Sequence, residues 1–150
     1  MKVNTRALLV LSLLSTPVLA ADLVNVAGAS QVAIDGYDPV AFFTDARPVN
    51  GSPSITATYK GATYYFASEE HKKLFAQSSE KYAPQYGGFC AFGVSHDALF
   101  PVDISTWQVR NGKLYLNLNP DVLKLFNTDF DGNIAKAEKN WPGLVKKDGK

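Results

Sequence analysis

Two β-hairpin signals set the strongest limit on how this chain can fold. Each consists of two β-prone runs separated by a two-residue turn that contains glycine, and Asn-Gly is the pair most favoured in such turns. The runs are Thr56–Tyr59 and Ala62–Phe66 around Lys60-Gly61, and Trp107–Arg110 and Lys113–Leu118 around Asn111-Gly112. The sequence therefore predicts two antiparallel hairpins.

Helix signals lie between and after these hairpins. Ser68 and Asn119 are good N-caps, and Asn119 is followed by a proline and an acid in the first turn. The expected helices cover 40–43 after the cap Asp38, 69–77, 80–82, a segment from Pro120, and Asp131–Trp141, which Pro142 is expected to end. Short helices that alternate with hairpins indicate an α+β fold. We expect a single domain over 21–150, with its core at about 35–118 and a C-terminal helical extension at about 119–145.

The first twenty residues have the layout of a secretory signal peptide. Lys2 and Arg6 give a positive start, 7–14 is almost wholly apolar, and small residues precede a cleavage point after Ala20. The apolar run is much shorter than the ~20 residues that span a membrane. We therefore predict an exported, periplasmic protein that does not span the membrane after cleavage.

Charge and cysteine content exclude several classes of protein. The formal net charge is +1, which argues against a nucleic-acid binder, because such proteins present a basic face. The single cysteine, Cys90, excludes an intramolecular disulfide framework and a zinc site built on several thiolates.

Cys90, His71 and His96 are the candidate functional side chains. Gly87-Gly88 lies directly before Phe89 and Cys90, and a helical turn starting there would place the thiol near free backbone N–H groups, which makes a thiol more reactive or metal-binding. The alternative is a small buried side chain. One cysteine with two histidines suits a soft transition metal such as copper, provided that folding brings the three together. A protease-like Cys-His pair lacks an oxyanion-forming motif, so no catalytic residues are predicted.

Two further residue sets have a structural and a functional interpretation. Asp35, Asp38 and Asp103 lie near turns, where they serve as turn and cap residues or as paired carboxylates. A tyrosine-rich set surrounds the hairpins, either as core aromatics or as the lining of a ligand groove.

Much of the chain resembles the YHS domain. The resemblance rests on Asp38-Pro39-Val40, on the run from Tyr59 to Ser68 and on Glu80-Lys81-Tyr82. An exported subgroup is more similar still, since it continues with segments like Tyr86–Ala91 and Asn111–Asn117. The resemblance implies a small hairpin-plus-helix unit, related to treble-clef-like modules, and a role in heavy-metal handling.

The resemblance also bears on the site residues. Metal-binding members carry cysteines where this chain has Ala41, Ala67 and His71, so a thiolate site of that type cannot form here. Selenocysteine sometimes replaces the thiol at the position of Cys90 in the exported subgroup, which implies redox or soft-metal chemistry there.

Three functions remain open from the sequence. We predict first a metal-associated binding module with Cys90, His71 and His96 as ligands and a metal ion or a metal-handling protein as partner. The second is a thiol redox protein in which Cys90 is the reactive thiol. The third is a non-catalytic domain that binds a small ligand or a protein through its tyrosines.

Overall fold

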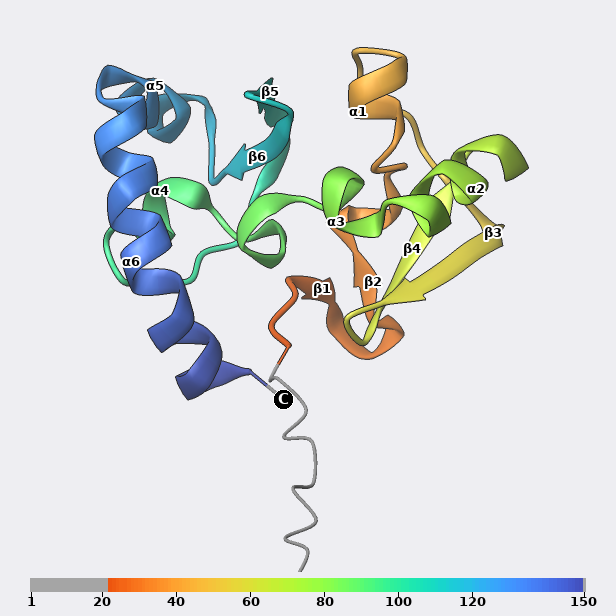
Figure 1. Ribbon diagram of the computed structural model, residues 1–150, viewed down its shortest axis with the longest axis horizontal. Helices are drawn as coiled ribbons and strands as arrows, with labels where there is room; N and C mark the ends of the chain where they lie inside the picture. Colours follow the sequence, from red (N-terminus) through yellow and green to blue (C-terminus); the bar gives the residue numbers. More distant parts are fainter. Residues whose placement is uncertain (1–21, 150) are drawn as a thin grey trace, which may run out of the picture.

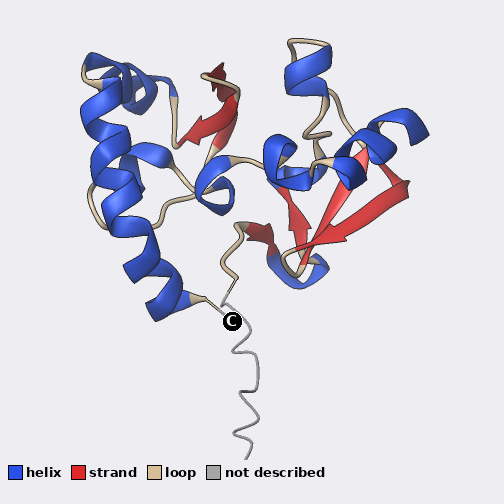
Figure 2. Cartoon of the chain, viewed as in Figure 1, coloured by secondary structure: helices blue, strands red, loops and turns tan. Residues whose placement is uncertain are grey.

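The computed structural model describes residues 22–149 and shows an α+β fold (Figures 1 and 2). The predicted signal peptide lies outside the described residues. Within the part of the chain that the structure describes, no helix has the length and apolar character needed to cross a membrane.

A four-stranded sheet contains the first predicted hairpin. Its strands are β1 (Val26–Ala27), β2 (Val32–Ala33), β3 (Ser52–Tyr59) and β4 (Ala62–Phe66), in the order β1-β2-β4-β3. β3 and β4 pair antiparallel across Lys60-Gly61, and both turn residues have positive φ, as a tight hairpin turn requires. β2 pairs parallel to β4. This strand ends at Ala33, because Ile34 has a φ of 44° and begins a 3-10 turn (η2, Ile34–Gly36).

Three short helices pack near this sheet: α1 (Ala41–Thr44), α2 (Glu69–Gln77) and α3 (Ser79–Tyr82). The predicted cap of α2 is confirmed, because Ser68 Oγ accepts a hydrogen bond from the His71 backbone N–H at 3.1 Å. The cap fixes where the helix starts, and it therefore places His71 in the first turn of α2.

The rest of the chain forms the second hairpin and three further helices. After the 3-10 segment η3 (Gln85–Gly88) come α4 (Ala91–Ser95), β5 (Asp103–Arg110), β6 (Lys113–Asn117), α5 (Pro120–Thr128) and α6 (Phe130–Asp148). Figure 1 shows the β5–β6 hairpin between α5 and α1, and β5 contacts both of these helices.

The predicted end of the last helix is wrong. Pro142 lies inside α6, which continues to Asp148. Proline removes one backbone hydrogen bond, but tertiary packing on both sides of Pro142 holds the helix. Trp141 packs against the ring of Tyr86 at a centroid distance of 5.8 Å, and Leu144 is buried.

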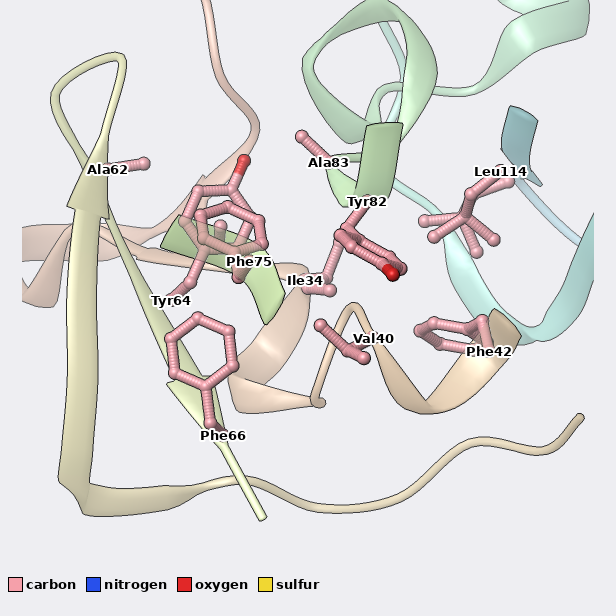
Figure 3. Close-up of a cluster of buried hydrophobic side chains, with 12 residues drawn as sticks. Ile34, Val40, Phe42, Ala62, Tyr64, Phe66, Phe75, Tyr82, Ala83 and Leu114 are labelled. Carbon is pink, nitrogen blue, oxygen red and sulfur yellow. The ribbon is translucent and has the colours of Figure 1, made fainter. Parts of the chain in front are cut away.

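The buried side chains form two clusters. The first gathers around Phe75, whose ring packs on Tyr64 and Phe66 at centroid distances of 4.9 and 5.2 Å (Figure 3). The second joins β6 to α5 and α6 through Tyr115, Phe126 and Phe130. The candidate site residues do not all lie near the same cluster.

Candidate functional site

Asp38 organises the first candidate site. Its side chain is fully buried, and both carboxylate oxygens accept backbone hydrogen bonds. Oδ1 accepts from Val40 N at 2.8 Å and from Ala41 N at 3.4 Å, which confirms the predicted role of Asp38 at the start of α1. Oδ2 accepts from Ala67 N at 2.8 Å, so the same carboxylate joins α1 to the connection between β4 and α2.

His71 provides the remaining hydrogen-bond contact of this carboxylate. Its Nδ1 lies 2.7 Å from Asp38 Oδ2. Because every other donor to Asp38 is a backbone N–H, the carboxylate is held rigidly and fixes the imidazole ring in turn. With Nδ1 carrying the hydrogen that it donates to Asp38, the neutral ring keeps its lone pair on Nε2.

Nε2 of His71 faces two polar side chains at the end of α1. Thr44 Oγ1 lies 3.3 Å away and Asp45 Oδ1 lies 3.8 Å away. Thr44 also donates to Asp45 Oδ1 at 2.7 Å. The side chain of His71 is 14% exposed and that of Asp45 is 33% exposed, so this edge of the ring can be reached from solvent. We call Asp38, Thr44, Asp45 and His71 the His71 site.

Cys90 lies elsewhere and is sealed in the interior. It is 1% exposed and precedes α4, where Sγ accepts a hydrogen bond from Gly93 N at 3.4 Å. Its thiol contacts Asn117 Oδ1 at 3.6 Å. Burial raises the pKa of the Cys90 thiol, while the backbone N–H groups of Gly93, Leu118 and Phe92 act in the opposite direction.

His96 lies at the C-terminal end of α4. Its Nδ1 is 2.9 Å from the carbonyl oxygen of Phe92 and 2.9 Å from Ser95 Oγ, and its ring packs on Phe92 at a centroid distance of 4.4 Å. These contacts are typical of a side chain that closes a helix end.

The structure does not bring the three predicted ligands together. His71 contacts α1, Cys90 contacts β6, and His96 contacts its own helix. Across residues 22–149, no group of three or more His, Cys, Asp or Glu side chains is arranged to hold a metal ion. A site that combines Cys90, His71 and His96 is therefore not assembled in this structure.

Sequence reasoning did not identify the pairing of Asp38 with His71 or the proximity of Asp45. The sequence indicated Asp38 as a turn and cap residue or as a paired carboxylate, and it indicated His71 as a metal ligand together with Cys90 and His96. The available signal was that both lie in the segment that resembles the YHS domain, but no local pattern joins residues so far apart in the chain.

Two tyrosines of the predicted set, Tyr64 and Tyr86, line a separate cleft of about 800 Å³. Tyr59 and Tyr64 line it from the first hairpin, and Tyr86 and Trp141 line it from the other half of the molecule. Tyr86 donates a hydrogen bond to Glu138 Oε1 at 3.1 Å within this cleft. Neither Cys90 nor either histidine is among its lining residues.

The comparison with protein families identifies a YHS domain in this chain. Residues 40–86 match the family model of the YHS domain, a range that includes Thr44, Asp45 and His71. Cys90 and His96 lie beyond it. No curated protein and no solved structure matches the chain.

Proposed function

Because the chain contains a YHS domain, we propose that it is a metal-associated module that binds a divalent transition-metal ion through His71 and Asp45. The observation that carries the proposal is the 2.7 Å contact between Asp38 Oδ2 and His71 Nδ1. Ligating histidines ordinarily donate their second ring N–H to a carboxylate or a carbonyl oxygen, which fixes the tautomer and raises the basicity of the ligating nitrogen.

The distance across the site suits a shared ion. His71 Nε2 and Asp45 Oδ1 are 3.8 Å apart. This is less than twice a metal–ligand bond of about 2.0–2.2 Å, so one ion can contact both atoms. Thr44 Oγ1, at 3.3 Å from Nε2, supplies a further oxygen beside it.

The donor types indicate which metals fit. One imidazole nitrogen and one carboxylate oxygen favour Cu²⁺ or Zn²⁺, whereas Cu⁺ prefers thiolate and thioether sulfur. The proposal therefore keeps the predicted ligand His71 and replaces the predicted thiolate with Asp45. Cys90 is unsuited to the role because the residue is 1% exposed and its sulfur contacts β6 rather than α1.

Two donors alone make an open site. The side chain of Asp45 is 33% exposed, so water or a group from a metal-handling partner would fill the remaining coordination positions. Such a site binds reversibly, which suits a protein that receives and releases a metal ion.

We also propose that the protein is exported. Residues 1–20 are proposed to direct the chain to the periplasm and to be removed there, on the basis of their charge and apolar pattern. Sequencing the N-terminus of protein recovered from the periplasm tests this part, because a chain that still begins at Met1 contradicts it.

Metal titration of the protein without an affinity tag tests the site. Calorimetry with Cu²⁺ and with Zn²⁺ should give one binding event. His71→Ala should abolish it, and Asp45→Asn should weaken it by about 10-fold. His96→Ala is the matched control, since it removes the other imidazole and should leave the affinity unchanged. Unchanged binding in His71→Ala, or no binding by the parent protein, would refute the proposal.

A further inference from the structure

Asn117 has a buried side-chain amide whose oxygen has hydrogen-bond partners and whose nitrogen has none among the described residues. It is the last residue of β6 and is 0% exposed. Its Oδ1 accepts a hydrogen bond from Phe92 N at 3.1 Å and contacts the Cys90 thiol at 3.6 Å. Among the described residues, its Nδ2 is a buried side-chain polar atom without a hydrogen-bond partner. Buried polar groups without partners are rare, because an unmade hydrogen bond is costly in the interior.

Rotating the side-chain amide of Asn117 does not satisfy all of its hydrogen bonds. If Oδ1 and Nδ2 exchanged places, the NH₂ group would face the N–H of Phe92, and two donors would meet. The backbone of Asn117 is also fixed, because its N–H donates to Thr106 Oγ1 at 2.8 Å. The unpaired NH₂ group is therefore a stable feature of this packing.

Donors exceed acceptors around the Cys90 sulfur. Gly93 N donates to Sγ at 3.4 Å, and Phe92 N donates to the neighbouring Asn117 Oδ1 at 3.1 Å. The unpaired NH₂ group belongs to the same amide whose oxygen contacts the thiol. The NH₂ group of Asn117 lacks a hydrogen-bond acceptor, and an oxygen atom attached to the Cys90 sulfur would provide one.

We propose that a hydroperoxide oxidises Cys90 to a sulfenic acid, whose oxygen accepts a hydrogen bond from Asn117 Nδ2. The inference is independent of the metal site at His71. In the reaction, the thiolate sulfur attacks one peroxide oxygen, so that an S–O bond forms and the O–O bond breaks. The alkoxide or hydroxide that leaves takes up the thiol proton, the sulfur loses two electrons, and the peroxide is reduced to an alcohol or water.

Burial makes the reaction slow and the product durable. The segment around Phe100 is held against the backbone of Cys90, since Cys90 N donates to the carbonyl oxygen of Phe100 at 3.1 Å. A peroxide reaches the sulfur only when this loop opens locally. The chain has no second cysteine that could resolve the sulfenic acid as a disulfide, so the oxidised form persists until a small external thiol reduces it. The oxidation state of Cys90 would thus show whether the protein has been exposed to peroxide.

Native protein treated with hydrogen peroxide and then with dimedone, a sulfenic-acid reagent, tests the proposal. Mass spectrometry should find the adduct on the peptide that contains Cys90, and Cys90→Ser should give none. Without dimedone, oxidation should raise the melting temperature by about 3 °C, because the buried NH₂ group gains its acceptor. Absence of the adduct in the folded protein would refute the proposal.

A matched variant isolates the contribution of the amide. Asn117→Asp keeps an acceptor for the N–H of Phe92 but removes the NH₂ donor, so oxidation should no longer raise its melting temperature. A direct measurement on the parent protein tests the same hydrogen bond if Asn117→Asp does not fold. The side-chain NH₂ protons of Asn117 should shift downfield in the NMR spectrum on oxidation, and unchanged shifts in protein with confirmed sulfenic acid would overturn the hydrogen bond.

Discussion

Asp38 Oδ2 and His71 Nδ1 are 2.7 Å apart, although the two residues are separated by 33 positions in the chain. The pair joins the start of α1 to the first turn of α2. One buried carboxylate thereby caps a helix, accepts the backbone N–H of Ala67 and orients the imidazole whose Nε2 faces Asp45. The structural roles of Asp38 and its proposed role in metal binding are combined in a single side chain.

Asp38→Asn should weaken both stability and metal binding. The new NH₂ group either replaces the acceptor of Val40 N–H or faces the N–H of Ala67, so buried donors meet or lose their partner. We expect a loss of about 2–3 kcal/mol in the free energy of unfolding, measured by urea denaturation. Metal affinity measured by calorimetry should fall about 10–100-fold, since the ring loses its orienting carboxylate.

Asp35→Asn is the control for this variant. Asp35 is exposed and has a φ of 51°, a conformation that asparagine tolerates. Its stability should stay within about 0.5 kcal/mol of the parent protein. If Asp38→Asn matched this control in both measurements, the carboxylate would have neither role.

Tyr64 should make the protein less stable at alkaline pH. Burial of the hydroxyl raises the pKa of Tyr64 above its ordinary value of 10.0. The folded state therefore holds this proton more tightly than the unfolded state. The stability that results is fully present below about pH 10 and is lost as the pH rises toward the folded-state pKa.

Urea denaturation near pH 8 and near pH 11 measures this loss. Tyr64→Phe should lose less stability between these two pH values than the parent protein, because it has no phenol to ionise. Adding Tyr86→Phe should reduce the loss further, since burial and Glu138 raise the pKa of Tyr86 as well. An identical loss in the parent and in Tyr64→Phe would contradict the assignment.

Local sequence signals predicted the hairpins and helix starts well. Lys60-Gly61 and Asn111-Gly112 form the predicted turns, because each pair adopts positive φ at both residues. Ser68 and Asn119 cap the predicted helices, since a side-chain oxygen and the N–H that it accepts lie within three residues of each other. Both kinds of signal depend on a few neighbouring residues.

Features that depend on tertiary packing were not predictable in this way. Pro142 was expected to end the last helix, but packing of Trp141 against Tyr86 holds α6 together beyond it. The partners of Cys90 and His71 also come from distant segments, so the sequence suggested reactive side chains without showing which residues surround them. The treble-clef likeness stays a prediction.

Phe75 should be the most sensitive position tested in the first core cluster. Its ring contacts Tyr59, Tyr64 and Phe66 at centroid distances between 4.9 and 5.8 Å. Phe75→Ala would leave a cavity and lower the free energy of unfolding by about 3–5 kcal/mol in urea denaturation. Leu74→Ala, at a half-buried neighbouring position, should cost less than half as much. Equal losses would mean that the aromatic cluster does not dominate this core.

Gly87 should be far more sensitive to substitution than Gly61, although both adopt positive φ, at 60° and 75°. A Cβ at Gly87 would collide with the backbone carbonyl of Leu23, whereas a Cβ at Gly61 meets no atom within 4 Å. Gly61→Ala should therefore show only the conformational cost, about 1 kcal/mol. Gly87→Ala should add the displacement of the N-terminal segment, which is held by the hydrogen bond from Asn25 N to Gly87 O at 2.9 Å.

Hydrogen exchange with urea denaturation distinguishes these two costs. In Gly87→Ala, the Asn25 amide should lose its protection and the free energy of unfolding should fall by at least about 2 kcal/mol. In Gly61→Ala, the Asn25 amide should remain protected, because the β3–β4 turn is open to solvent at that position. Equal destabilisation, with Asn25 protected in both variants, would show that residues 22–25 do not pack against Gly87 in solution.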